Sequence, residues 1–189
     1  MYPLTCSNYN HTCDSYLYHI SKGRNPEEIA SFYSVNTSRI TPIKHNSDID
    51  YLVSVQCRCE QDNSGHGYYL YDSVYVRKSG ETVEYISDEY YSGQVWKVSG
   101  EDEELTVHLV CGCQENEAQE VVTYTIQSKD TLIGISDLLS AKEIEVENLN
   151  KILTKDPNYM DVGWVLFVPR EKNQIRASTS KTKRSEYFV

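Results

Sequence analysis

"VQCRCE" (Val55–Glu60) and "LVCGCQ" (Leu109–Gln114) each end a short apolar run with a Cys-X-Cys pair. In an extended strand, residues i and i+2 point to the same face, so the two cysteines of each pair should project together. A bond within one pair would close a strained ring, so each cysteine should bond a distant partner. The two pairs are therefore predicted to act as double anchors between separate parts of the chain.

The chain has six cysteines, and the other two are Cys6 and Cys13. An even number of cysteines, together with N-X-S/T sequons at Asn10 and Asn36, is typical of a secreted, disulfide-bonded glycoprotein. The sequence alone leaves many disulfide connectivities open. A zinc site built from the two Cys-X-Cys pairs is the less favoured alternative, because the sequons and the two upstream cysteines fit a disulfide framework better.

The length of 189 residues and the hydrophobic content of 39% suit either one ordinary domain or several very small modules, which would need covalent cross-links. The net charge of −10 argues against nucleic-acid binding. The sequence contains no apolar run of about 18 residues, the length needed to span a membrane, and no signal-peptide pattern. We therefore expect a mature secreted protein or an excised ectodomain.

Three segments align with one another: "YHISKGRNPEEIA" (Tyr18–Ala30), "YVRKSGETVEYIS" (Tyr75–Ser87) and "YTIQSKDTLIGIS" (Tyr124–Ser136). Each begins with a tyrosine, continues through a polar turn and reaches an isoleucine eleven residues on. This order predicts a strand, a tight turn and the start of a helix. A spacing of about fifty residues indicates a repeat architecture.

The third segment predicts a β-α-α-β module. Val121–Gln127 is rich in β-branched and aromatic residues, so it should be a strand, and Asp130 or Thr131 should cap the next helix. A second short helix is expected in "VENLNKIL" (Val146–Leu153). A final strand is expected in "VGWVLFVP" (Val162–Pro169), and its terminal proline should stop it.

"YTIQSKDTLIGIS", the "LN" at 149–150 and "GWVLFVP" at 163–169 resemble a LysM module. Three LysM-like copies separated by two Cys-X-Cys pairs look like the ectodomain of a plant LysM receptor kinase, over residues 6–170. The segments "CDSYLYHIS", "FYSVNTSRI", "DYLVSVQCRC", "YSGQVW" and "VVTYTIQSKDT…DVGWVLFVPRE" resemble the exopolysaccharide-receptor branch of that family, whose first two modules diverge from conventional LysM. The resemblance implies an α+β fold of three small LysM-like modules clamped together by three disulfides.

The implied division has four parts. The first repeat is residues 1–59, including the N-terminal cysteine segment; the second is 60–113; and the third, the most conventional, is 114–170. Residues 171–189 are polar and basic and are predicted to be a disordered stalk or an expression remnant. The resemblance also implies the disulfide pairs Cys6–Cys59, Cys13–Cys113 and Cys57–Cys111.

Two departures from the family pattern argue against carrying a chitin-binding groove onto the first two repeats. Asn25-Pro26 stands where D-T-L or E-T-V stands in the other repeats. Ser54 and Val110 replace prolines that commonly precede the Cys-X-Cys pairs.

No pattern of a catalytic site is present. A glycosidase needs two carboxylates about 5 to 9.5 Å apart across a cleft, whereas the acidic run at 101–104 is polar on all sides and suits a solvated loop, or alternatively a weak calcium site. The histidines show no zinc-protease spacing, and there is no nucleophile elbow or phosphate loop. We expect a binding protein that uses no metal and no cofactor.

A protein that binds glycans needs polar loops and exposed aromatic rings. We assign Tyr18, Tyr75 and Tyr124 to packing. The aromatic residues expected in loops are Tyr90, Tyr91, Trp96 and Tyr159.

In LysM modules the glycan groove lies between the loop after the first strand and the loop before the last strand. The resemblance places it in the third repeat at 129–133 and 157–161, and the candidate contacts are Lys129, Asp130, Thr131, Leu132, Asn158, Tyr159 and Met160. Asp130 has the alternative role of a helix cap. In the first repeat the corresponding loops hold Lys22, Arg24, Lys44 and His45, a basic patch that would favour an acidic exopolysaccharide, unless these are ordinary surface cations.

The resemblance implies that the chain recognises rhizobial exopolysaccharide at the extracellular face of the plant plasma membrane and controls bacterial entry in root symbiosis. A LysM co-receptor is the implied partner. The implied transmembrane helix and intracellular kinase lie outside these residues. The alternatives are a receptor for chitin or lipochitin oligosaccharides and, more remotely, a secreted peptidoglycan hydrolase or inhibitor.

Overall fold

The computed structural model describes residues 1–100, 103–114, 118–154 and 160–172. Two of the predicted glycan contacts, Asn158 and Tyr159, lie outside the described residues, as does the predicted tail from residue 173 onward. Within the described part, every helix is too short or too polar to cross a membrane.

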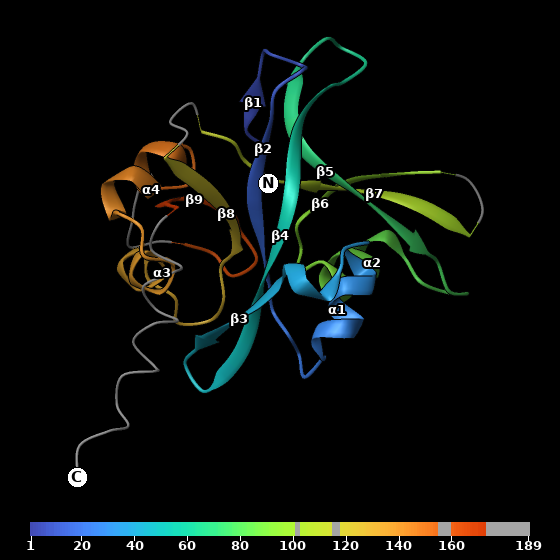
Figure 1. Ribbon diagram of the computed structural model, residues 1–189, viewed down its shortest axis with the longest axis horizontal. Coiled ribbons are helices and arrows are strands. Elements are labelled where there is room, and N and C mark those ends of the chain that lie inside the picture. Colours follow the sequence, from blue (N-terminus) through green and yellow to red (C-terminus); the bar gives the residue numbers. More distant parts are fainter. Residues whose placement is uncertain (101–102, 115–117, 155–159, 173–189) are drawn as a thin grey trace.

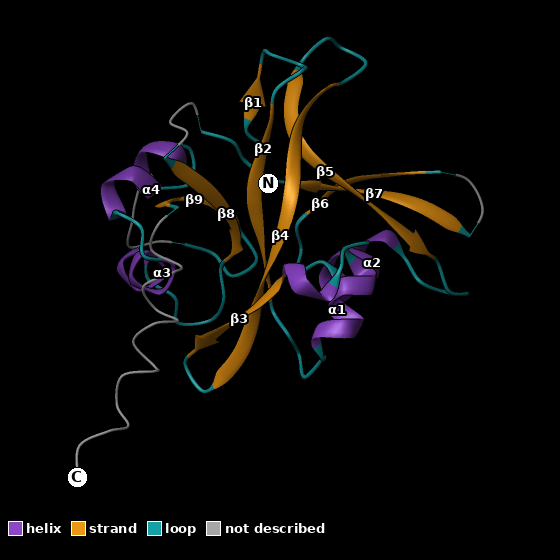
Figure 2. Cartoon of the chain, in the orientation of Figure 1, coloured by secondary structure: helices purple, strands orange, loops and turns teal. Residues whose placement is uncertain are grey.

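Strands and helices are mixed along the chain, so the fold class is α+β, as predicted (Figures 1 and 2). The strands are β1 (Thr5–Cys6), β2 (Thr12–His19), β3 (Ile40–His45), β4 (Asp48–Gln61), β5 (Gly67–Val76), β6 (Val95–Ser99), β7 (Glu104–Val110), β8 (Gln119–Thr125) and β9 (Val165–Glu171). The helices are α1 (Pro26–Phe32), α2 (Val83–Tyr90), α3 (Leu132–Leu139) and α4 (Glu143–Leu149), with a short 3-10 turn at Thr37–Arg39.

The described strands form one nine-stranded sheet in the order β6-β7-β5-β4-β2-β8-β9, with β1 added to β5 and β3 added to β4. The long strand β4 runs through the middle, with α1 and α2 on one side of it and α3 and α4 on the other (Figure 1). The predicted boundary between residues 59 and 60 falls inside β4, which continues to pair with β5. Strand β2 pairs in parallel with β8, at Tyr16↔Val122, so backbone hydrogen bonds also join the first repeat to the third.

The same local structure recurs where the three sequence segments align. In each, the helix N-cap lies seven residues after the leading tyrosine, and its side chain accepts a backbone hydrogen bond; the caps are Asn25, Thr82 and Thr131. The isoleucine eleven residues after the tyrosine is almost fully buried in all three; these are Ile29, Ile86 and Ile135. The predicted order of strand, turn and helix start is therefore present three times.

In the third repeat the β-α-α-β order is also present, with two corrections. The second helix begins earlier than predicted, at Glu143, and ends at Leu149. Asn150 then ties the end of this helix to the last strand, because its side-chain amide donates to the carbonyls of Val146 and Phe167, both at 2.7 Å. The prediction that Pro169 stops the last strand is wrong, since β9 continues to Glu171. This proline is tolerated because β9 lies at the edge of the sheet.

The three disulfides join the pairs that the resemblance implies, Cys6–Cys59, Cys13–Cys113 and Cys57–Cys111. Because all six cysteines are bonded in this way, no thiolate is free to form the alternative zinc site. The loops that they close span 53, 100 and 54 residues. On chain-entropy reasoning, each cross-link stabilises the fold by roughly 4 kcal/mol.

Tyrosines contribute heavily to the buried core. The assignment of Tyr18, Tyr75 and Tyr124 to packing agrees with their burial, at 0%, 7% and 0% exposed. The expectation that Tyr90 and Tyr91 are exposed rings is wrong, since they are 7% and 0% exposed and pack between the helices and the sheet. Tyr90, Tyr91 and Trp96 are the described members of the set expected in loops. Among these three, only the ring of Trp96, on β6, is exposed, at 39%.

Candidate functional site

Three loops meet at the junction of the first and third repeats. They are the β2–α1 loop, the turn between β3 and β4, and the β8–α3 loop, and each contains a residue other than glycine with positive φ: Lys22, Asn46 and Lys129. Such conformations are uncommon outside glycine and often occur at functional loops. The loops border a cavity of about 330 Å³, whose lining includes Lys22, His45, Asp50 and Gln127.

His45 lies at the centre of this junction and links the two repeats. Its Nε2 is 3.3 Å from Oδ1 of Asp130, and its Nδ1 is 3.1 Å from the side-chain nitrogen of Gln127 and 3.7 Å from Oδ2 of Asp50. In this geometry the Gln127 amide donates to Nδ1, which leaves the Nε2 hydrogen directed at Asp130. The structure thus brings together His45 and Asp130, which the sequence analysis placed in separate candidate grooves.

The same tyrosine–carboxylate pair fixes the turn before the helix in the third repeat, at the junction, and in the second repeat, outside it. Tyr124 donates to Asp130 at 2.7 Å, and the equivalent tyrosine of the second repeat, Tyr75, donates to Glu81 at 2.8 Å, six residues on in both cases. The backbone N–H groups of Gln127 and Lys78 donate to the same two carboxylates, so each turn is fixed in the same way.

The first repeat has Arg24 where these repeats have a carboxylate, so its tyrosine and its turn bond a carboxylate from another strand. Tyr18 donates to Asp50 of β4, at 2.8 Å, and the backbone N–H of Ser21 donates to the same residue at 2.9 Å. The rings of Tyr18 and Tyr124 lie edge to face, with centroids 4.6 Å apart. Burial, followed by the bonded carboxylate, raises the pKa of both tyrosines well above their usual range, so both hydroxyls stay protonated and donate.

The predicted contacts of the third repeat have mixed positions. Lys129 is exposed beside the junction, while Asp130 is occupied by its internal hydrogen bonds and Thr131 caps α3. The Leu132 side chain is 2% exposed and packs in the core, so it presents no surface to a ligand. Met160 is half-buried against the same cluster.

The predicted basic patch of the first repeat is largely neutralised. Lys22 Nζ lies 3.0 Å from the carboxylate of Glu89 on α2, and Arg24 bonds the same carboxylate. The hydrogen bond from Arg24, followed by that from Lys22, lowers the pKa of the Glu89 carboxyl. His45 lines the cavity, whereas its neighbour Lys44 projects from the opposite face of β3.

Sequence reasoning missed Asp50 and Gln127 as members of the site. Asp50 is 3% exposed on the inward register of β4, two residues before the buried Leu52. A carboxylate at an inward position of a strand is unusual, because burying it requires hydrogen-bond partners. That position in "DIDYLVSV" could have indicated Asp50, whereas nothing in the sequence distinguished Gln127.

The junction offers hydroxyl-binding chemistry. Lys22 and Asn46 provide donors, and the carboxylate of Asp48 and the amide of Gln127 provide acceptors around one open cavity, whereas the buried carboxylate of Asp50 already accepts from Tyr18 and Ser21. The lining thus includes both a cation, Lys22, and an exposed carboxylate, Asp48. The site therefore suits a polar ligand rich in hydroxyl groups better than a strongly charged one.

No family model matches this chain, and no curated protein matches its sequence. Two solved structures are similar in fold. A structure described as the ectodomain of a receptor like kinase has a TM-score of 0.60 and 14% identity, over 83% of this chain and 91% of that one. A structure of the LYK3 ectodomain has a TM-score of 0.61 and 17% identity, over 91% of this chain and 94% of that one. This chain therefore has the fold of those ectodomains along nearly its whole length.

Proposed function

We propose that this chain is the extracellular carbohydrate-recognition region of a plant receptor kinase, built from three LysM-like modules. The observation that carries the proposal is the fold shared with two receptor ectodomains over most of both chains. The three disulfides suit an oxidising compartment outside the cell. The transmembrane helix and kinase of the parent protein belong to sequence beyond these residues, and a second LysM receptor is the proposed co-receptor.

The proposed ligand is a rhizobial exopolysaccharide, whose recognition would control bacterial entry into the root. The resemblance of several segments to the exopolysaccharide-receptor branch supports this choice. The first repeat also supports it, because Arg24 replaces the turn carboxylate that the other repeats use, so its loops differ from a conventional LysM groove. Local charge does not add to this support, since Glu89 pairs with Lys22 and Arg24.

A receptor for chitin or lipochitin oligosaccharides is the second candidate. The third repeat favours it, because Asp130, Thr131 and Leu132 keep the D-T-L turn of a conventional LysM module, with the aspartate bonded and the threonine capping the helix.

Binding without catalysis fits the position of the described carboxyl whose pKa is raised. A glycosidase needs a carboxylic acid with a raised pKa facing its substrate. Among the described carboxyls with a shifted pKa, only that of Glu120 is raised, by burial, and this residue is paired with Arg170 away from the cavity. The remote alternative of a peptidoglycan hydrolase therefore receives no support from the cavity.

Calorimetric titration of the purified chain tests the proposal. Defined exopolysaccharide repeat units and chitin oligomers of equal length are compared, and each oligosaccharide is recovered afterwards to check that it is intact. We expect saturable binding of the exopolysaccharide only. Preference for chitin would favour the second candidate, and a shortened oligosaccharide would favour the hydrolase.

Lys22→Ala tests the role of the junction. Its side chain is 42% exposed, so its ion pair contributes little to stability, and the variant should fold. Loss of one donor from the cavity should weaken binding about three- to ten-fold. Lys142→Ala, which removes an exposed lysine that likewise pairs with a carboxylate, Glu145, but lies outside this cavity, is the matched control.

A further inference from the structure

Trp96 is placed on the surface by an irregularity in the sheet. Strand β6 pairs with β7 at Val95↔Leu109 and then at Lys97↔His108, so Trp96 is the extra residue of a β-bulge. Val95 packs into the core with α1 and α2, whereas Trp96 is 39% exposed. Bulges commonly redirect a side chain beside a functional site.

The indole has a preformed aromatic neighbour. The ring of Tyr68 on β5 lies with its centroid 5.9 Å from that of Trp96, at an interplanar angle of 48°. Tyr68 itself packs against a buried cluster that includes Leu70 and Phe167. The two rings therefore form a supported platform with part of the indole open to solvent.

A row of polar side chains crosses the sheet beside this platform. Arg58 on β4 bonds Glu60 and, at 2.6 Å, Asp72 on β5; Asp72 bonds His108 on β7; and His108 Nε2 lies 2.8 Å from the hydroxyl of Ser99 on β6. Because these groups hold one another in place, their remaining donors and acceptors keep fixed positions.

The same cluster brings together three groups that suit a metal ion, Glu60, Asp72 and His108. The guanidinium of Arg58 already lies between the two carboxylates and supplies the positive charge. The cluster therefore suits the binding of a neutral polar ligand better than the binding of a cation.

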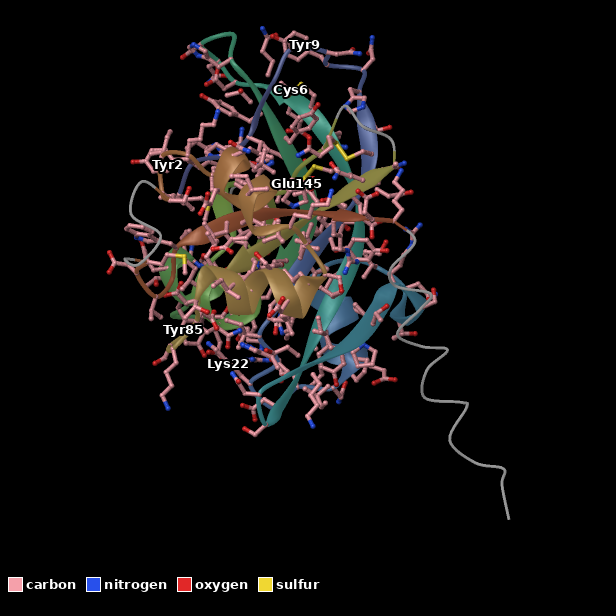
Figure 3. The ribbon with its side chains drawn as sticks, turned by 90° about the vertical axis from the view of Figure 1, so that its left-hand side faces the viewer. Tyr2, Cys6, Tyr9, Lys22, Tyr85 and Glu145 are labelled. Carbon is pink, nitrogen blue, oxygen red and sulfur yellow. A yellow bond between two sulfur atoms is a disulfide. The ribbon has the colours of Figure 1, made fainter. Side chains whose placement is uncertain are left out.

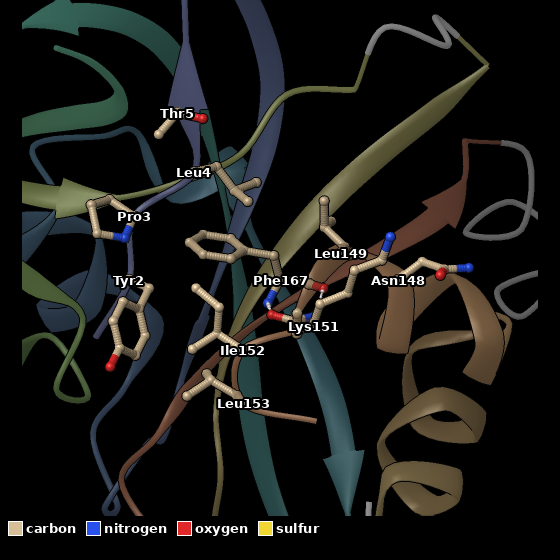
Figure 4. A pocket seen from close by; sticks show the side chains of 11 residues that line it. Tyr2, Pro3, Leu4, Thr5, Asn148, Leu149, Lys151, Ile152, Leu153 and Phe167 are labelled. Atoms are coloured by element: carbon tan, nitrogen blue, oxygen red, sulfur yellow. Dashed lines mark hydrogen bonds between the residues drawn. The ribbon is translucent and has the colours of Figure 1, made fainter. Parts of the chain in front are cut away.

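A cavity of about 320 Å³ continues this surface on the side of Tyr68 away from Trp96 (Figure 4). Thr5, which lines this cavity, is the direct strand partner of Tyr68. The cavity lies between residues 2–5 and the end of α4, and its rim includes Tyr2 and Ile152, which are 55% and 59% exposed. A path thus leads from Trp96 across Tyr68 and Thr5 into the cavity.

This surface is separate from the junction at His45. Strand β3, which carries His45, pairs with residues 48–53 of β4, whereas β5 pairs with residues 58–61, so the two lie toward opposite ends of β4 (Figure 1). Viewed from the side, Tyr2 and Cys6 lie toward one end of the molecule and Lys22 lies toward the other (Figure 3).

We propose that the Trp96 surface is a second saccharide-binding site, which takes a neutral stretch of oligosaccharide; this inference rests on the proposed function. The apolar face of one sugar ring stacks on the indole, and its hydroxyls bond the row from Arg58 to Ser99. The next sugar lies over Thr5 in the cavity. A saccharide fits better than a protein partner, because paired charges occupy the centre of the surface, where a protein interface is usually depleted of charge.

Fluorescence quenching by acrylamide tests this directly, because the chain has two tryptophans and Trp164 is half-buried. Saturation with the exopolysaccharide repeat unit should protect wild-type fluorescence from acrylamide. The variant Trp96→Phe, which retains Trp164 alone, should show no protection. Equal quenching of wild-type with and without bound saccharide would overturn the inference.

Affinity measurements provide the second readout. Trp96→Ala should weaken saccharide binding about three- to ten-fold, whereas Trp96→Phe should retain most of it. Tyr85→Ala removes an aromatic ring that is 50% exposed on α2, outside this surface, and is the matched control.

The outcomes separate the two proposals. If wild-type binds saccharide and Trp96→Ala binds equally well, the inference fails and the proposed function stands. If wild-type binds none of the saccharides, both fail. If raising the protein concentration protects Trp96 from acrylamide and adding saccharide does not, the surface is instead a contact between two copies of the chain, and the inference is overturned.

Discussion

His19 should make the stability of this fold depend on pH. Its side chain is fully buried at the end of β2, where Nδ1 lies 3.1 Å from the Tyr33 hydroxyl and Nε2 has no hydrogen-bond partner among the described residues. Burial, followed by the nearby charge of Arg24, lowers the pKa of His19 from 6.5 to about 4. The folded state therefore keeps this histidine neutral at pH values where the unfolded chain protonates it.

The sign and size of the effect follow from proton linkage. Between pH 6.5 and about 4 the unfolded state binds one more proton at His19 than the folded state, so stability is full above pH 6.5 and falls as the pH is lowered. The slope is about 1.4 kcal/mol per pH unit, which gives a total loss of roughly 3 kcal/mol across this range.

Urea unfolding with the disulfides intact measures this loss. Wild-type and His19→Gln are compared at pH 7.5, 6, 5 and 4.5, each followed by circular dichroism. Glutamine keeps a hydrogen-bonding group near Tyr33 but cannot take up a proton, so the variant should lose less stability on acidification. The two proteins share every other ionisable group, so the difference isolates His19. Parallel pH profiles for the two proteins would refute the reasoning.

Two further predictions concern stability. Replacing Cys13 and Cys113 together by serine should lower the free energy of unfolding by roughly 4 to 5 kcal/mol, because their disulfide closes a loop of 100 residues; urea unfolding measures this, and a loss below about 1 kcal/mol would contradict it. Asn150→Ala should cost roughly 2 to 4 kcal/mol, because it removes two hydrogen bonds to Phe167 of β9 and one to Val146 of α4 and leaves buried backbone groups unpaired. The exposed Asn148→Ala is its matched control in thermal unfolding, and equal melting temperatures for the two variants would argue against this role.

Local structure was largely predictable from the sequence. The starts of α1, α2 and α3 were predictable because cap residues such as Thr82 and Thr131 accept backbone hydrogen bonds, and these chemical preferences act within a few residues. Turn chemistry also repeated, as the pairs Tyr75–Glu81 and Tyr124–Asp130 show.

The arrangement of the segments was less predictable, because it depends on contacts between residues far apart in the chain. Nothing in the local pattern of β2 indicates that it pairs with β8 more than a hundred residues later. The charge of Arg24 suggested an open basic patch until Glu89 of another repeat was found beside it. The burial of Tyr91 likewise results from helices that pack together only in the complete fold.

The position of β2 in the sheet governs the order in which the chain can fold. Strand β2 lies between β4 and β8, so its neighbour on one side is synthesised long after β2 itself. Cys13 can form its native disulfide only after Cys113 has been synthesised, whereas Cys6 is close to it in the sequence and is present from the beginning. A growing chain in an oxidising compartment is therefore exposed to early bonding between the two N-terminal cysteines, and such a bond must be reshuffled before the sheet can close. Recovery of the native protein should depend on thiol–disulfide isomerase activity more than on the speed at which any single helix or hairpin forms.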